Sequence, residues 1–135
     1  MRMPADQQPP FAAYVGIKIT MLTPDRVEGE LEIRPELGNR NGVAHGGAIM
    51  TFTDNLAGTA STANLPDDKS VTTIESKINF FSAIAVGEIA RGECVPLHRG
   101  RTTQVWQSRI TRPDGRLAAI AIHTQMVIPA VGAKK

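Results

Sequence analysis

The stretch that decides the fold is GGAIMTFTDNLAGTASTAN, residues 46–64. Apolar or small residues lie on every side of a helical projection of it, and threonine and serine supply most of its polarity. It is too long for one strand, and Asn64-Leu65-Pro66 marks its end. A helix without a charged face is usually enclosed by the rest of the protein. The stretch therefore predicts one long buried helix from Gly46 to about Asn64.

Asp54 is the single charged residue in this stretch. A buried carboxylate is costly unless a partner compensates it, so Asp54 is expected either to be paired or to have a functional role. Small residues follow it, including Ala57, Gly58 and Ala60, and they would let a sheet approach the helix backbone closely.

The rest of the chain favours strands. Before the helix, a strand is expected at about Gly16–Leu22, and a second runs from Val27 to Arg34, where apolar and charged residues alternate. Four strand-like stretches follow the helix: Val71–Phe81, Glu88–Val95, Thr102–Thr111 and Leu117–Ile128. The connections between these four are short, which indicates antiparallel pairing. The fold class predicted is α+β, an antiparallel sheet with one long helix.

Length and composition indicate one ordinary domain. A chain of 135 residues fits a single domain over 1–135, with residues 1–12 expected to be loose and a short helix or turn around Phe11–Val15. The segment Pro35–Gly42 is expected to be a loop.

Charge and cysteine content exclude several classes of protein. A net charge of +2 gives no reason to expect nucleic-acid binding. No signal-peptide core or membrane-spanning stretch is found, so we expect no membrane association and a cytoplasmic location. The single Cys94 cannot form an internal disulfide, and His98 and His123 lack metal-ligand spacing, so no metal is expected.

One constellation is specific enough to indicate a family. The spacing of Asn39, Gly42, His45-Gly46-Gly47 and Asp54 resembles that of the hotdog-fold acyl-CoA thioesterases, in their phenylacetyl-CoA branch. Three later segments resemble the family as well: Ile78-Asn79-Phe80, Val86-Gly87-Glu88 and Arg99-Gly100-Arg101. The similarity covers about Val15 to Ile128. The chain departs from many relatives at Phe81-Ser82-Ala83-Ile84, where they have a proline. It also has Thr73, or Thr72 if the alignment slips by one, where they often have serine.

The resemblance implies a hotdog fold and hydrolysis of an acyl-CoA thioester to a free acid and CoA. It implies no cofactor, since coenzyme A is part of the substrate, and a homodimer with shared active sites, assembled further into a dimer of dimers. It also assigns the Gly46 amide as the donor that stabilises the oxyanion, and Gly47 to binding of the substrate. The role of Gly46 agrees with the unpaired N–H groups and positive dipole end at a helix start. The alternative for Gly46 and Gly47 is a tight strand-to-helix turn.

Asp54 lies eight residues beyond Gly46, about 12 Å along a helix. One chain therefore cannot easily bring both groups to one thioester carbon, whereas a two-fold dimer with antiparallel helices can. Asp54 is interpreted as a general base or a nucleophile, and the sequence leaves both open; its alternative is a hydrogen-bonded structural acid.

The remaining site candidates have supporting roles. Asn39 could order the water or the carbonyl, or simply form a turn. His45 could be a general base, but the resemblance implies that it mainly fixes the loop and helix start through hydrogen bonds. Thr73 could position the attacking water, or be an ordinary strand residue.

Arg99, Gly100 and Arg101 form a basic segment suited to the phosphates of CoA, although basic strand residues are often simply solvated. For the acyl group, Thr51 and Leu56 are expected to line the pocket, and the small Ala57 and Gly58 to leave room for an aromatic or medium-chain group. Two other functions stay open: an enoyl-thioester hydratase, and a non-catalytic acyl-CoA-binding protein. A binding protein would not need an acid at the site.

Overall fold

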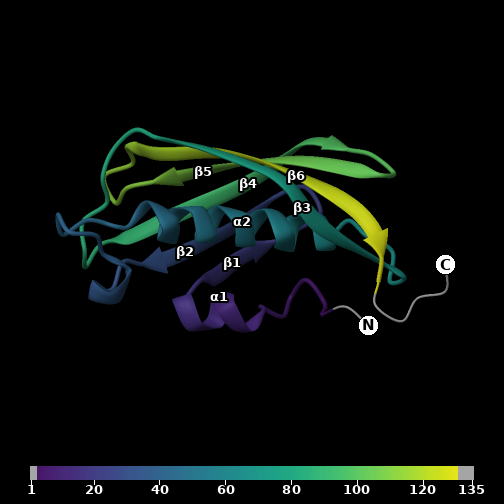
Figure 1. The fold of residues 1–135 in the computed structure, drawn as a ribbon, viewed down its shortest axis with the longest axis horizontal. Helices are drawn as coiled ribbons and strands as arrows, with labels where there is room; N and C mark the ends of the chain where they lie inside the picture. The colour runs from purple at the N-terminus through teal and green to yellow at the C-terminus, as the bar shows by residue number, and fades with distance from the viewer. Residues whose placement is uncertain (1–2, 131–135) are drawn as a thin grey trace.

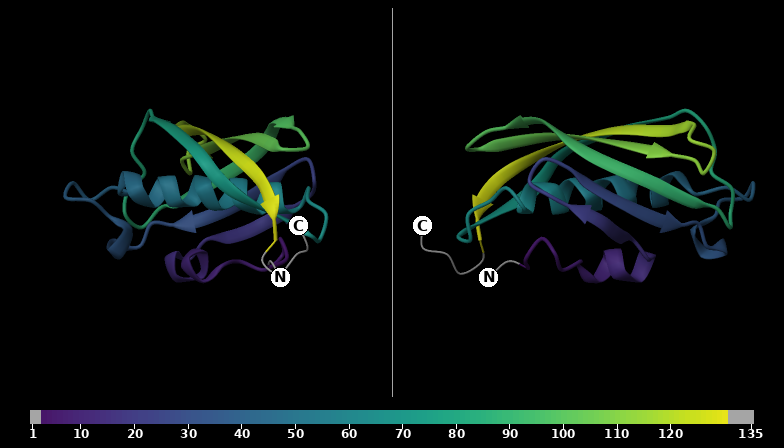
Figure 2. Two further views of the ribbon diagram at one scale, coloured as in Figure 1. Left: turned by 45° about the vertical axis from the view of Figure 1, so that its right-hand side comes forward. Right: turned by 180° about the vertical axis from the view of Figure 1, so that it is seen from behind.

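In the computed structural model, which describes residues 3–130, a single antiparallel sheet curves around one long helix (Figures 1 and 2). The helix is α2 (Gly46–Thr62), and a short helix α1 (Pro10–Val15) lies beside it. The six strands are ordered β1-β2-β4-β5-β6-β3. Their bounds are β1 Lys18–Leu22, β2 Val27–Glu32, β3 Lys69–Phe80, β4 Ile89–Arg99, β5 Thr103–Thr111 and β6 Leu117–Pro129, and a 3-10 turn η1 spans Pro35–Leu37. The α+β class and the sheet wrapped around one helix are confirmed.

The core forms where α2 meets the concave face of the sheet. Alternate residues of β2 and β5 are buried, as a strand with one face against a helix requires. Phe52 and Leu56 of α2 are fully buried and pack where Gly29 of β2 and Gly92 of β4 leave no side chain. The absence of these two side chains lets the helix and the sheet approach closely.

The strand boundaries agree with the sequence to within a few residues, but the expected pairing across the connection between β3 and β4 is wrong. The short segment between β3 and β4 does not join paired strands, because β3 pairs with β6 and β4 pairs with β2 and β5. Its backbone pairs elsewhere instead: Ile84 O accepts from Ala44 N at 2.7 Å, and Gly87 N donates to Ile33 O at 2.7 Å. β4 also extends beyond the expected Val95, since it includes His98 and Arg99.

The N-terminal expectation is corrected as well. A helix does occur around Phe11–Val15, since α1 spans Pro10–Val15 with Ala12 and Val15 buried. Residues 3–9, expected to be loose, lie against α2 and contact it through Gln8. Met1 and Arg2, also within that expectation, lie outside the described residues.

The helix is not enclosed on every side. The Asp54 side chain is 53% exposed in the single chain, so the expectation of a buried acid is wrong there. The reason is that β3 is an edge strand, most of whose residues are exposed, and it leaves one flank of α2 open. No helix in the described part of the chain is long and apolar enough to cross a membrane.

The close packing of α2 on the sheet predicts that two glycine-to-alanine substitutions change the free energy of unfolding in opposite directions. A Cβ on Gly92 would lie 2.6 Å from Leu56 Cδ1 and 2.9 Å from Phe52 Cζ, so Gly92→Ala should lower the free energy of unfolding by about 1–3 kcal/mol. Gly58→Ala is the matched control, because its Cβ meets nothing within 4 Å and alanine favours the helix by about 0.5–1 kcal/mol. Urea unfolding of both variants measures the difference; equal stabilities would contradict the packing argument.

Candidate active site

The start of α2 presents one free backbone donor. His45 is the N-cap residue, and its Nδ1 accepts a hydrogen bond from the Gly47 amide at 2.8 Å. The Gly46 amide donates to no acceptor within residues 3–130. The cap therefore uses the Gly47 amide and leaves Gly46 as the donor available to a ligand.

His45 has the kind of hydrogen bonds that a supporting role requires. Its backbone N–H donates to Leu37 O at 2.8 Å, which ties the helix start to the preceding loop. Because Nδ1 accepts from an amide, it carries no proton in this arrangement. It stays a prediction that His45 does not act as a general base.

Asn39 forms the turn that the sequence left open as one of its two roles. Its Oδ1 accepts from the backbone N–H of Asn41 at 2.8 Å and of Val43 at 3.3 Å, so it forms the loop before the helix. Its Nδ2 has no partner among the described residues. The turn thus uses the oxygen and leaves the amide nitrogen as a second donor.

Asn39 and Gly46 line a first cavity of about 280 Å³, which we call the donor cavity. Its other walls are mostly apolar, and the ring of Phe80 lies 3.2 Å from the position that a Cβ on Gly46 would take. The full lining is Asn39, Val43, Ala44, Gly46, Ile49, Phe80, Phe81, Ser82, Ala83, Ile84, Ala118 and Ala119. The donors therefore face an apolar space.

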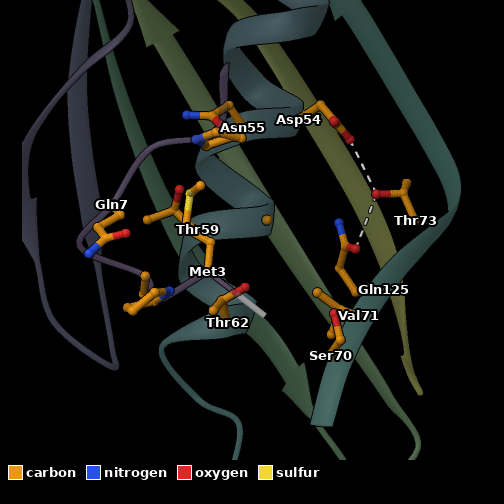
Figure 3. Close-up of a pocket in the computed structure, with 14 residues that line it drawn as sticks. Met3, Gln7, Asp54, Asn55, Thr59, Thr62, Ser70, Val71, Thr73 and Gln125 are labelled. Atoms are coloured by element: carbon orange, nitrogen blue, oxygen red, sulfur yellow. Dashed lines mark hydrogen bonds between the residues drawn. The ribbon is translucent and has the colours of Figure 1, made fainter. Parts of the chain in front are cut away.

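Asp54 accepts a hydrogen bond from the Thr73 hydroxyl at 3.3 Å, and Thr73 Oγ1 is also 3.1 Å from Oε1 of Gln125 (Figure 3). Thr73, rather than Thr72, is therefore the hydroxyl next to the acid. Gln125 lies opposite Thr73 across the β3–β6 pair and is 1% exposed. Its Nε2 is buried without a partner in the described residues.

His123 is a neighbour of Asp54 that sequence reasoning missed. Its imidazole is fully buried, with Nδ1 2.6 Å from Ser76 Oγ and 3.8 Å from Asp54 Oδ1. Burial lowers the pKa of His123 below its ordinary 6.5, and the Asp54 carboxylate opposes that shift. A signal was available: His123 and Gln125 continue the alternation of Ala119 and Ala121 on β6, so two polar residues occupy inward-facing positions.

Asp54 lies in a second cavity of about 300 Å³, which we call the acid cavity (Figure 3). It runs over the open flank of α2. Its lining is Met3, Pro4, Ala5, Gln7, Pro9, Asp54, Asn55, Gly58, Thr59, Thr62, Ser70, Val71, Thr73 and Gln125. The donor cavity and the acid cavity share no residue, so a single chain holds the donors and the acid apart.

The expected pocket lining is partly wrong. Leu56 and Ala57 are fully buried in the core, because they lie on the face of α2 that packs on the sheet. Thr51 lines neither cavity, and its hydroxyl donates to Gly47 O at 2.9 Å. Gly58 does line the acid cavity, and the space beside it is open.

The basic segment is only partly free. Arg99 Nη1 pairs with Asp25 Oδ1 at 2.7 Å and lies 3.4 Å from Oδ1 of Asn64, just beyond the end of α2. Gly100 N donates to Thr103 O at 2.8 Å. Arg101 is exposed and forms no ion pair with a described residue. In the single chain this segment contacts neither Asp54 nor Gly46. The part of the chain that the structure describes also contains no cluster of three potential metal ligands.

The fold agrees with that of known proteins that this chain resembles. The model of the thioesterase superfamily matches residues 41–119. A Mycobacterium tuberculosis protein named as an esterase is 34% identical over 113 residues, which are 82% of this chain and 80% of that one. Its solved structure superimposes with a TM-score of 0.85 at 31% identity and covers 90% of this chain and 98% of that one.

Two further relatives carry more specific names. The proofreading thioesterase EntH of Cronobacter turicensis is 30% identical over 103 residues, 76% of this chain and 74% of that protein. A Streptococcus pneumoniae thioesterase, solved with coenzyme A, is 25% identical with a TM-score of 0.78 and covers 84% of this chain and 87% of its own. The chain belongs to the thioesterase superfamily, with the hotdog fold of these neighbours. It is a thioester hydrolase.

The N-cap makes a prediction about His45. His45→Ala should lower the free energy of unfolding by about 1 kcal/mol, because the Gly47 amide loses its acceptor. His45→Asn is the matched control, since an asparagine oxygen caps this position well and should keep most of the stability. Urea unfolding measures both. Equal losses in the two variants would mean that the cap hydrogen bond contributes little.

Burial of His123 predicts a pH dependence of stability. Because its pKa is lower in the folded protein than its ordinary 6.5, the unfolded chain binds more protons as the pH falls below 6.5. The free energy of unfolding should therefore decrease between about pH 7 and pH 5, and His123→Gln should flatten this dependence. Urea unfolding at several pH values measures it. An identical slope in the variant would show that other groups cause it.

Proposed function

We propose that this protein is an acyl-CoA thioesterase whose active site forms between two copies of the chain. The observation that carries the proposal is the separation of the donor cavity from the acid cavity along α2. Gly46 and Asp54 are eight residues apart, about 12 Å in a rigid helix, so they serve one carbonyl only if they come from different subunits.

The edge strand β3 supports the dimer. It is 12 residues long, with β6 on one side and no described strand on the other. Ile74 and Phe80 of β3 are 56% and 53% exposed, and the adjacent Phe81 is 59% exposed. A long edge with exposed apolar residues favours pairing with another strand. Antiparallel pairing with β3 of a second copy would set the two α2 helices antiparallel and bring each acid cavity to the other chain's donor cavity.

The chemistry then follows from the groups in each half. The Gly46 N–H and Asn39 Nδ2 donate to the thioester oxygen and stabilise the negative charge that develops on it. The partner's Asp54, oriented by Thr73, takes a proton from water while the water oxygen bonds to the carbonyl carbon. The carbon–sulfur bond breaks, and the thiolate of CoA leaves and takes up the proton that Asp54 removed from the water. We assign Asp54 as a general base, because the neighbouring hydroxyl can also hold the water.

The acyl group is proposed to occupy the acid cavity beside Gly58. Its volume of about 300 Å³ and the open space at Gly58 suit an aromatic or medium-chain group. The relative solved with coenzyme A supports CoA as the carrier. Arg101 is then the better candidate for its phosphates, since Arg99 is paired with Asp25. The phenylacetyl-CoA subtype, the tetramer and the cytoplasmic location stay predictions.

A hydratase would use a histidine together with an acid, and His123 does lie 3.8 Å from Asp54. Its imidazole, however, is fully buried and its Nδ1 is occupied by Ser76, so it cannot reach a substrate. A non-catalytic binding protein has no use for the Asp54–Thr73 pair. Hydrolysis therefore fits the site better than either alternative.

The test separates the two halves of the site. Asp54→Asn should reduce release of CoA thiol at least about 100-fold, as loss of a general base does. Gly46→Pro deletes the donor N–H and should reduce kcat by about 100-fold. Proline suits the first position of a helix, and the backbone of His45 (φ −61°, ψ 136°) is compatible with a following proline. Gly46→Ala keeps the N–H and adds a similar Cβ, so it is the matched control.

Mixing the two inactive variants tests the shared site. A mixed dimer contains one site with both residues intact, so random exchange should restore about a quarter of wild-type activity. Thiol release from a panel of acyl-CoA substrates measures this. A mixture that stays inactive after subunit exchange would place the site within one chain, and full activity of Asp54→Asn would refute the role of the acid.

A further inference from the structure

The N-terminal residues 3–9, which we call the strap, form a wall of the acid cavity. Five of them line it, namely Met3, Pro4, Ala5, Gln7 and Pro9. Figure 3 shows Gln7 on the side of α2 away from Thr73 and Gln125, with Met3 near Thr62. The cavity is thus bounded by the strap on one side, by β3 and β6 on the other, and by α2 as its floor.

The strap is fixed to α2 close to the acid. Gln8 Oε1 accepts a hydrogen bond from Asn55 Nδ2 at 2.7 Å, and Gln8 Nε2 lies 3.5 Å from Thr59 Oγ1. Asn55 is adjacent to Asp54 in sequence, and Thr59 lies about one helical turn further on. The chain that follows the strap is held as well, because α1 buries Ala12 and Val15 in the core.

The direction of the cavity makes the strap relevant to the acyl group. From Asp54 past Gly58 to Thr62 the cavity follows α2 for about 12 Å. A chain attached to a carbonyl near Asp54 would pass the open space at Gly58 and then reach Met3 near Thr62. Proline at positions 4 and 9 limits the conformations of this wall.

From this geometry we infer that the strap is the specificity-determining element of the active site, and that Met3 limits the length of the acyl chain that the acid cavity accepts. The inference rests on the proposed function, since it takes the acid cavity as the acyl site. Gln8 acts through the strap as a positioning residue: it does not line the cavity, but it fixes the residues that do.

The experiment compares kcat/KM for straight-chain acyl-CoA substrates from butanoyl to dodecanoyl. Met3→Trp adds bulk at the distal end and should lower the ratio of long-chain to short-chain kcat/KM by about tenfold. Gln8→Ala releases the strap and should raise the same ratio by about tenfold. Asp6→Ala is the matched control, because Asp6 belongs to the strap but neither lines the cavity nor contacts α2 in the described structure. Its ratio should equal that of the wild type.

The outcomes separate this inference from the proposed function. Opposite shifts in Met3→Trp and Gln8→Ala, with unchanged midpoints of thermal unfolding, support the strap as the length determinant. An unchanged ratio in both variants, while Asp54→Asn is inactive, overturns the inference and leaves the proposed function standing. A wild type that releases no thiol from any acyl-CoA overturns the proposed function and the inference together.

Discussion

The constraint on which the site depends is the rigidity of α2. One uninterrupted helix carries the free Gly46 amide at its start and Asp54 two turns later, and a helix cannot bend to bring them together. The sheet reinforces this constraint, since Phe52 and Leu56 pack against Gly29 and Gly92 and hold the helix close to the sheet. The distance between donor and acid is therefore fixed by the core, which is why the proposed site takes its donor and its acid from two chains.

The polar groups near the acid are arranged by the sheet rather than by the helix. Gln125 and His123 face α2 from β6, and their partners Thr73 and Ser76 face it from β3. Asp54 itself is half exposed, but the groups behind it are buried. An acid with one open side and one hydrogen-bonded side can meet a substrate while its carboxylate keeps a fixed orientation.

Much of the fold could be predicted from the sequence, because hydrophobic period and turn residues report local structure directly. The alternation in β2, and the stretch of α2 whose single charged residue is Asp54, predict the positions of these elements to within a few residues. The path from β3 to β4 could not be predicted, since it depends on hydrogen bonds with the distant residues Ala44 and Ile33. The residues around the acid also divide into those that local sequence reveals and those that it does not. The position of Asp54 followed from a motif, whereas its contact with His123 depends on how β3 and β6 pair. The strap was missed because its attachment is one side-chain pair, Gln8 with Asn55, which no periodicity reveals.

A β-bulge between Thr73 and Glu75 shifts the alternation of inward-facing and outward-facing side chains along β3. In a regular strand, residues three apart point to opposite faces, yet Thr73 and Ser76 pair opposite Gln125 and His123, which are both buried. The extra residue, Ile74, is turned outward and is 56% exposed. Thr73 therefore faces the acid before this extra residue, and Ser76 faces His123 after it. One strand thus presents a hydroxyl to the acid at one end and Phe80 to the donor cavity at the other. This one extra residue in β3 thus allows the same strand to line both the acid cavity and the donor cavity.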